Sequence, residues 1–164
     1  MVADGLLTRQ RYREVPPRVD YELTERSRDL MPVIGALARW GYDWTWSEPR
    51  PGERVEIGAI LRAAPGLLAP AKSVKGTVAC AVAGERGQDR TYALTASGGT
   101  VTISEDADAG ADATVSGDVE AWVRALGPAG DTSALQFGGD RKLADALLSE
   151  LVGAAASDAA RAAA

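Results

Sequence analysis

The chain has 164 residues, which allows one ordinary domain or two small ones and excludes a large enzyme with separate cofactor and substrate domains. Its 46% hydrophobic residues, 25% charged residues and net charge of −5 are typical of a folded protein without a membrane-spanning segment. The first residues, Met1 to Gly5, have neither the basic nor the apolar region of a secretory signal. These observations predict a cytoplasmic protein.

The chemistry open to the chain is narrow because it has no histidine and a single cysteine, Cys80. Ser-His-Asp and Cys-His catalysis need an imidazole, zinc sites draw on His and Cys, and disulfide frameworks need cysteine pairs. The glycine pairs Gly98-Gly99 and Gly138-Gly139 lack the spacing of a phosphate-binding loop, and the acidic stretch from Glu105 to Asp108 lacks that of a calcium loop. We therefore expect no enzyme activity, no metal site and no cofactor.

Charge is distributed unevenly along the chain. Residues 1–46 hold seven arginines against seven acidic residues, whereas residues 47–164 hold eleven basic and sixteen acidic residues. Within ten residues, four arginines are opposed only by Glu14, and these are Arg9, Arg11, Arg13 and Arg18. Such a stretch is suited to contact phosphates, although a solvated strand face has the same pattern.

The first 23 residues predict a β-hairpin. Val19, Tyr21 and Leu23 alternate with charged residues, which is the period of a strand with one buried face. The preceding stretch from Leu6 to Tyr12 supplies the partner strand, and Pro16-Pro17 belongs in the connection because proline cannot donate to a central ladder.

A helix is predicted from Glu25 to about Trp40, with Thr24 as its N-cap. Pro32 falls inside this helix and is expected to bend it, and Gly41 is expected to end it. One face carries apolar residues at helical spacing, namely Leu30, Val33, Ile34 and Leu37.

This segment resembles the wing and following helix of HxlR-type winged-helix transcriptional regulators. The resemblance is carried by Gly5-Leu6-Leu7-Thr8-Arg9, Tyr12, Glu14-Val15-Pro16-Pro17-Arg18-Val19, Tyr21, Leu23-Thr24-Glu25 and Leu30-Met31-Pro32-Val33. It implies a partial winged helix over residues 1–46 in a homodimeric DNA-binding regulator. The wing arginines (Arg9, Arg11, Arg13 and Arg18) would touch DNA, and Leu30, Val33 and Leu37 would pair across the dimer axis.

The same resemblance places the recognition helix ahead of the segment that begins at Val2. A wing mostly contacts phosphates, which positions a protein on DNA without specifying sequence. We therefore expect the 164 residues alone to bind DNA weakly or not at all. Under this resemblance the sequence is either a complete chain or a truncated form of a longer regulator.

Residues 47–54 are predicted to be a linker because they contain two prolines, a glycine and mixed charges. Four aromatic residues precede it, namely Trp40, Tyr42, Trp44 and Trp46. Such a cluster packs two parts of a protein together more often than it stacks on a ligand or base, and both alternatives stay open.

Residues 55–153 predict an α+β domain. A short helix from Val55 to Leu68, interrupted at Pro65-Gly66, precedes about four strands of an antiparallel meander. Asp118 and Asp140 are N-caps of two amphipathic helices that would cover one face of the sheet. Residues 154–164 form an Ala-rich tail.

The order of a strand, Gly117-Asp118 and a helix, then a strand, Gly139-Asp140 and a final helix, resembles the sterol carrier protein 2 superfamily. This implies an SCP2-like domain that holds an apolar ligand such as a lipid between sheet and helices. The ligand-binding candidates are the residues expected to point inward, namely Val78, Tyr92, Leu94, Val101, Ile103, Trp122, Leu126 and Phe137. The alternative is that these side chains fill one another's space as an ordinary core.

Two functions follow from these patterns. The first is an HxlR-like transcriptional regulator, or a fragment of one, whose SCP2-like domain senses an apolar effector or stabilises a dimer. The second is a stand-alone lipid- or sterol-carrier-like module with a vestigial wing. Neither involves a membrane as partner.

Overall fold

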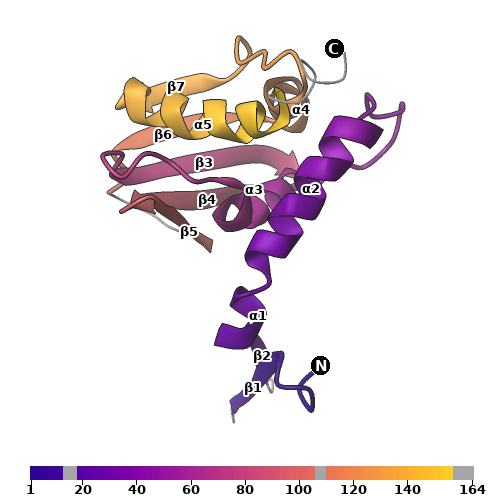
Figure 1. Cartoon of the computed structure of the whole chain (residues 1–164). Helices are drawn as coiled ribbons and strands as arrows, with labels where there is room; N and C mark the ends of the chain where they lie inside the picture. Colours follow the sequence, from indigo (N-terminus) through magenta and orange to yellow (C-terminus); the bar gives the residue numbers. More distant parts are fainter. Residues whose placement is uncertain (13–17, 106–109, 157–164) are drawn as a thin grey trace.

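The computed structural model describes residues 1–12, 18–105 and 110–156. It has two parts, a slender N-terminal arm and a C-terminal α+β unit, with one long helix running from the arm along the side of the unit (Figure 1). No helix of the described residues is long and apolar enough to cross a membrane.

The arm begins with the predicted hairpin. Strand β1 (Leu7–Tyr12) pairs antiparallel with β2 (Arg18–Leu23), and Leu7 faces Leu23 across the ladder. The hairpin prediction is therefore confirmed, while the proline-containing connection at residues 13–17 lies outside the described residues.

The single predicted helix is two helices. Thr24 caps α1 (Glu25–Arg28) by accepting the Ser27 N–H, as expected, but the chain then turns and starts again as α2 (Met31–Thr45). The predicted bend at Pro32 is wrong because this proline occupies the first turn of α2, where its missing N–H costs no intrahelical bond.

The predicted end at Gly41 is also wrong, since α2 continues to Thr45. A glycine in a helix costs only about 1 kcal/mol, which packing against a neighbouring helix outweighs. That neighbour is α3 (Ile57–Leu67), which retains Pro65 in its last turn and is not interrupted there.

The two helices cross with their backbones in direct contact. A Cβ added to Gly35 would lie 1.9 Å from the carbonyl oxygen of Gly66, and one added to Gly66 would lie 2.1 Å from that of Met31. Only glycine fits at both positions. Residues 46–56, all described, join α2 to α3 without a helix or strand.

A five-stranded mixed sheet forms the centre of the C-terminal unit, in the order β5-β4-β3-β6-β7. Its strands are β3 (Gly76–Glu85), β4 (Gln88–Ser97), β5 (Thr100–Glu105), β6 (Ala113–Asp118) and β7 (Gln136–Gly139). The expected antiparallel meander is correct for β3, β4 and β5, but β6 crosses to the far side of β3 and pairs with it in parallel. Alternation along a strand reports burial and not the direction of its partner, so the sequence pattern could not reveal this.

Three helices cover one face of the sheet, namely α3, α4 (Val119–Leu126) and α5 (Arg141–Ala156) (Figure 1). Asp118 accepts the Ala121 N–H at 2.8 Å and Asp140 accepts the Leu143 N–H at 3.2 Å, so both predicted N-caps are present. Helix α5 extends past Gly153 to Ala156, and residues 157–164 of the predicted tail lie outside the described residues.

Candidate functional site

One face of the β1–β2 hairpin carries arginines. Because side chains alternate along a strand, Arg9 and Arg11 project from the same face as their cross-strand partners Tyr21 and Val19. The Arg9 guanidinium lies 5.9 Å from the centroid of the Tyr21 ring. Both arginines are exposed, and neither forms an ion pair with any residue that the structure describes. Arg13 and the side chain of Arg18 lie outside the described part of the chain.

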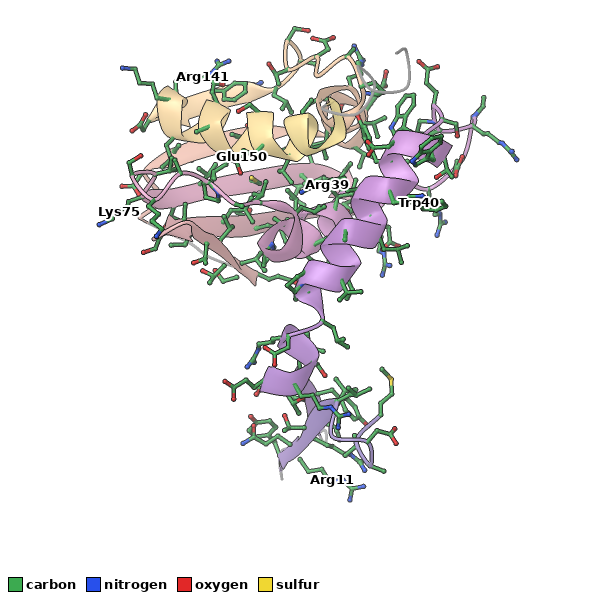
Figure 2. The ribbon with its side chains drawn as sticks, viewed as in Figure 1. Arg11, Arg39, Trp40, Lys75, Arg141 and Glu150 are labelled. Carbon is green, nitrogen blue, oxygen red and sulfur yellow. The ribbon has the colours of Figure 1, made fainter. Side chains whose placement is uncertain are left out.

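The hairpin is fixed to α1 by hydrogen bonds from two hydroxyl groups to the backbone before β1. The Thr24 hydroxyl donates to the Gly5 carbonyl oxygen at 2.8 Å. The hydroxyl of buried Ser27 donates to the Leu6 carbonyl oxygen. These bonds set the orientation of the arginine face relative to the start of α2. Figure 2 shows Arg11 at the end of the arm, away from the C-terminal unit.

The predicted dimer residues lie on the exposed side of α2. Val33 is 63% exposed and Leu37 65% exposed, with Leu30 nearly half exposed. Because α2 runs beyond Gly41, this apolar stripe continues past Trp40 to Trp44. We call the exposed series Leu30, Val33, Leu37, Trp40 and Trp44 the α2 stripe.

The aromatic cluster expected near the linker is divided between two environments. Tyr42 and Trp46 lie together, with ring centroids 6.4 Å apart, whereas Trp40 and Trp44 are exposed on the α2 stripe. Trp46 also approaches α4, since a Cβ on Gly127 would lie 3.3 Å from its ring. Tyr42 and Trp46 thus join the arm to the C-terminal unit.

An apolar cavity of about 570 Å³ lies between α2 and the C-terminal unit. Helix α3 and the ends of α4 and α5 form its other walls. Its main apolar lining residues are Ile34, Tyr42, Trp46, Val55, Ile60, Leu67, Val123, Leu126 and Leu151.

Few polar groups border this cavity. Arg39 of α2 donates from Nη2 to the Leu67 carbonyl oxygen at 2.9 Å, and Glu53 accepts the Arg50 N–H at 2.9 Å. The Tyr42 hydroxyl is buried and has no partner among the described residues. Its pKa is raised, first by burial and then by the charge of Asp43.

The eight predicted ligand-binding residues do not surround this cavity. Six are buried in the core and two, Ile103 and Phe137, pack partly buried against it. Leu126 is the member of this group that also lines the cavity. A ligand-binding role for these eight residues, or an ordinary core role, stays a prediction.

A buried acid that the sequence analysis did not single out fixes the start of α3. The β-bulge at residues 82–85 turns Glu85 inward, where it accepts the Gly58 N–H at 2.7 Å and the Tyr92 hydroxyl at 2.8 Å. Glu85 is 3% exposed, so these bonds replace its hydration. The sequence signal for this burial is weak. Val78, Cys80 and Val82 point inward at every second position, and Glu85 follows three positions after Val82, out of step with that alternation.

Glu105 belongs to the same side of the unit and is not a free loop acid. Its carboxylate accepts a hydrogen bond from Arg62 Nε at 2.7 Å. This bond lowers the pKa of Glu105 and raises that of Arg62. The neighbouring Asp106 and Asp108, whose stretch lacks the spacing of a calcium loop, lie outside the described residues. We assign this pair a structural role.

The N-terminal arm and α2 are similar in sequence to known transcriptional regulators. Residues 1–49 match the HxlR-like helix-turn-helix family. The HxlR-like segment is 40% identical over 52 residues to an uncharacterized HTH-type transcriptional regulator of Methanothermobacter thermautotrophicus, covering 32% of this chain and 40% of that protein. It is 46% identical over 44 residues to the regulator sll1512 of Synechocystis (27% and 33%) and 39% identical over 51 residues to YkvN of Bacillus subtilis (31% and 43%). The chain therefore spans only about a third to two fifths of the length of these relatives.

The solved structures similar to this chain include sterol carrier protein 2-like domains and a sec-alkylsulfatase, Pisa1 from Pseudomonas sp.. The crystal structure of sterol carrier protein 2 like 2 from Aedes aegypti is 20% identical, with a TM-score of 0.44, over 56% of this chain and 93% of that one. The sterol carrier protein domain 2 of Helicoverpa armigera is 15% identical, with a TM-score of 0.47, over 66% and 95%. At these identities the likeness concerns the fold alone.

Proposed function

We propose that this chain acts in transcriptional control as an HxlR-like regulator that contacts DNA through its hairpin. The observation that carries this proposal is the exposed arginine face within a segment that matches helix-turn-helix regulators. Arg9 and Arg11 stand side by side at the end of the arm, with Arg13 and Arg18 completing the basic stretch in sequence.

Phosphate contact is the chemistry that such a face supports. Each arginine that neutralises a phosphate releases condensed counterions, so affinity falls steeply with salt. Recognition of base edges requires an element that enters a groove, and the basic stretch shows no pattern for such an element. We therefore expect the contact by this chain to be weak, salt-dependent and insensitive to sequence.

The proposal includes a homodimer formed through α2. Residues of the α2 stripe recur at alternating intervals of three and four, which is the spacing of a helix that packs against a second helix. Two copies of the stripe placed face to face would remove these side chains from water. Each large apolar side chain buried in this way contributes about 1.5–3 kcal/mol.

The C-terminal unit is proposed to take an apolar effector or to stabilise the dimer. The alternative function is a stand-alone lipid- or sterol-carrier-like module whose hairpin no longer contacts DNA. The apolar cavity is compatible with both functions, because it would hold an effector in one and a cargo in the other.

The test is a titration of a fluorescently labelled DNA duplex at several low salt concentrations, read by anisotropy. The variant Arg9→Ala/Arg11→Ala should bind more weakly, and its log–log salt slope should be shallower by about 0.9 for each phosphate that the protein no longer neutralises. The matched control is Arg50→Ala/Arg54→Ala, which removes two exposed arginines of the linker. Equal binding by the double variant and the wild type, or an equally weakened control, would refute DNA contact through the hairpin.

A further inference from the structure

The cavity between α2 and the C-terminal unit has the size and lining of a small-molecule site. Its volume of about 570 Å³ is within the roughly 300–1,000 Å³ typical of ligand pockets. Its walls come from both parts of the chain, because Ala38 and Tyr42 belong to α2 while Ile60 and Val123 belong to α3 and α4. Figure 2 shows Arg39 on the side of α2 that faces the unit, and Trp40 on the other side.

The charges at the cavity decide the class of ligand. Arg39 and Glu53 carry opposite charges, so the lining itself has no net charge. Asp43 adds a negative charge close to the Tyr42 ring, as the raised pKa of the Tyr42 hydroxyl indicates. An anionic head group would lose its hydration among apolar walls and meet no net positive charge in return.

We propose that this cavity binds an uncharged, largely apolar small molecule. The proposal deepens the effector role and rests on the proposed function only for its regulatory meaning. Binding itself needs neither DNA nor a second copy of the chain. A bound molecule would touch the inner side of α2, whose outer side carries the stripe, so its effect would pass through that helix to dimer and hairpin.

The first experiment compares two probes of equal chain length, 1-decanol and decanoate, by isothermal titration calorimetry at pH 7.5. We expect 1-decanol to bind at least tenfold more tightly than decanoate. Decanoate that binds as tightly as the alcohol would overturn the charge argument, and an alcohol that gives no binding would overturn the site.

Two substitutions on α2 locate the site. Ala38→Trp places a large side chain in the cavity and should weaken 1-decanol binding at least tenfold. Ala36→Trp, the same substitution outside the lining, should leave binding unchanged. Binding weakened to the same extent in both variants would place the ligand elsewhere.

A second measurement reports the position of the bound molecule through tryptophan fluorescence. Bromine quenches indole fluorescence at short range, so 10-bromo-1-decanol should quench the wild type in a saturable manner. Most of this quenching should vanish in Trp46→Phe, because Trp46 is the tryptophan of the cavity lining, whereas Trp40 and Trp44 lie on the exposed stripe and Trp122 is buried in the core. Quenching that persists in Trp46→Phe would refute the location. If the DNA titration shows no hairpin contact but the alcohols bind in the cavity, the carrier function is favoured and the proposed ligand site is retained.

Discussion

The contact between Gly35 and Gly66 makes a sharp prediction about how the arm is attached to the C-terminal unit. In Gly35→Ala the new methyl carbon would lie 1.9 Å from the Gly66 carbonyl oxygen, a backbone atom that cannot rotate away. Real Cβ contacts essentially never fall under 3.0 Å, so the helices must separate by about 1 Å or more. In Gly41→Ala, on the same helix, the nearest atom is Thr45 Oγ1 at 3.8 Å, an ordinary contact.

The two substitutions share one favourable effect, because alanine in a helix interior is better than glycine by about 1 kcal/mol. Only Gly35→Ala carries the overpacking cost, which is about 1–3 kcal/mol. The difference in unfolding free energy between the two variants therefore isolates the cost of the crossing. For a chain of this length it corresponds to about 2–4 °C in Tm for each kcal/mol.

Thermal unfolding followed by circular dichroism measures this difference. We expect Gly41→Ala to unfold above the wild type and Gly35→Ala to unfold below Gly41→Ala by at least about 2 °C. If Gly35→Ala is as stable as Gly41→Ala, then α2 and α3 do not cross through these glycines. The cavity beside the crossing would then have no fixed wall.

Three further predictions concern the stripe, the buried acid and the buried thiol. Leu37→Glu should convert a dimer to a monomer in sedimentation velocity, because the stripe would have to bury a charge; a wild type that is already monomeric contradicts the dimer. Tyr92→Phe removes the 2.8 Å bond to Glu85 and should cost about 1.5–3 kcal/mol in urea unfolding, whereas Tyr21→Phe, which removes a hydroxyl from an exposed side chain, should change stability by under about 0.5 kcal/mol. Burial raises the pKa of the Cys80 thiol from 9.0 to about 12, so the unfolded chain loses that proton first and stability falls as the pH rises from 9 toward 12. The wild type should therefore lose more stability than Cys80→Ala between pH 8 and pH 10.5, and parallel profiles would contradict the buried position.

Local signals in the sequence predicted local structure well. The alternation of Val19, Tyr21 and Leu23 indicated the correct strand, and Thr24, Asp118 and Asp140 cap helices as their side-chain chemistry indicates. In each case the determining contact lies within a few residues along the chain. The hairpin of the candidate DNA-contacting face was predictable for the same reason.

Features set by distant residues were not predictable in this way. The parallel pairing of β6 with β3 depends on a crossover whose direction no residue within either strand encodes. The cavity required α2 to pass Gly41 and to lie against α3, and that packing depends on Gly35 and Gly66, which are thirty-one residues apart. The predicted ligand residues belong to the sheet–helix core, whereas this cavity lies beside that core, against α2.

Helix α2 carries apolar residues on both its inner and its outer side. A helix that covers a single core turns its charged side chains to water and its apolar side chains inward. The side of α2 toward the C-terminal unit follows this rule in part, since Ile34 and Tyr42 line the cavity. Its two charged residues are Arg39, which stays exposed while it donates to the Leu67 carbonyl oxygen of α3, and Asp43, which has one buried carboxylate oxygen. The exposed side carries Val33, Leu37 and the tryptophans. We propose that the outer side of α2 packs against a second apolar surface, and its heptad-like spacing favours another copy of the same helix as that surface.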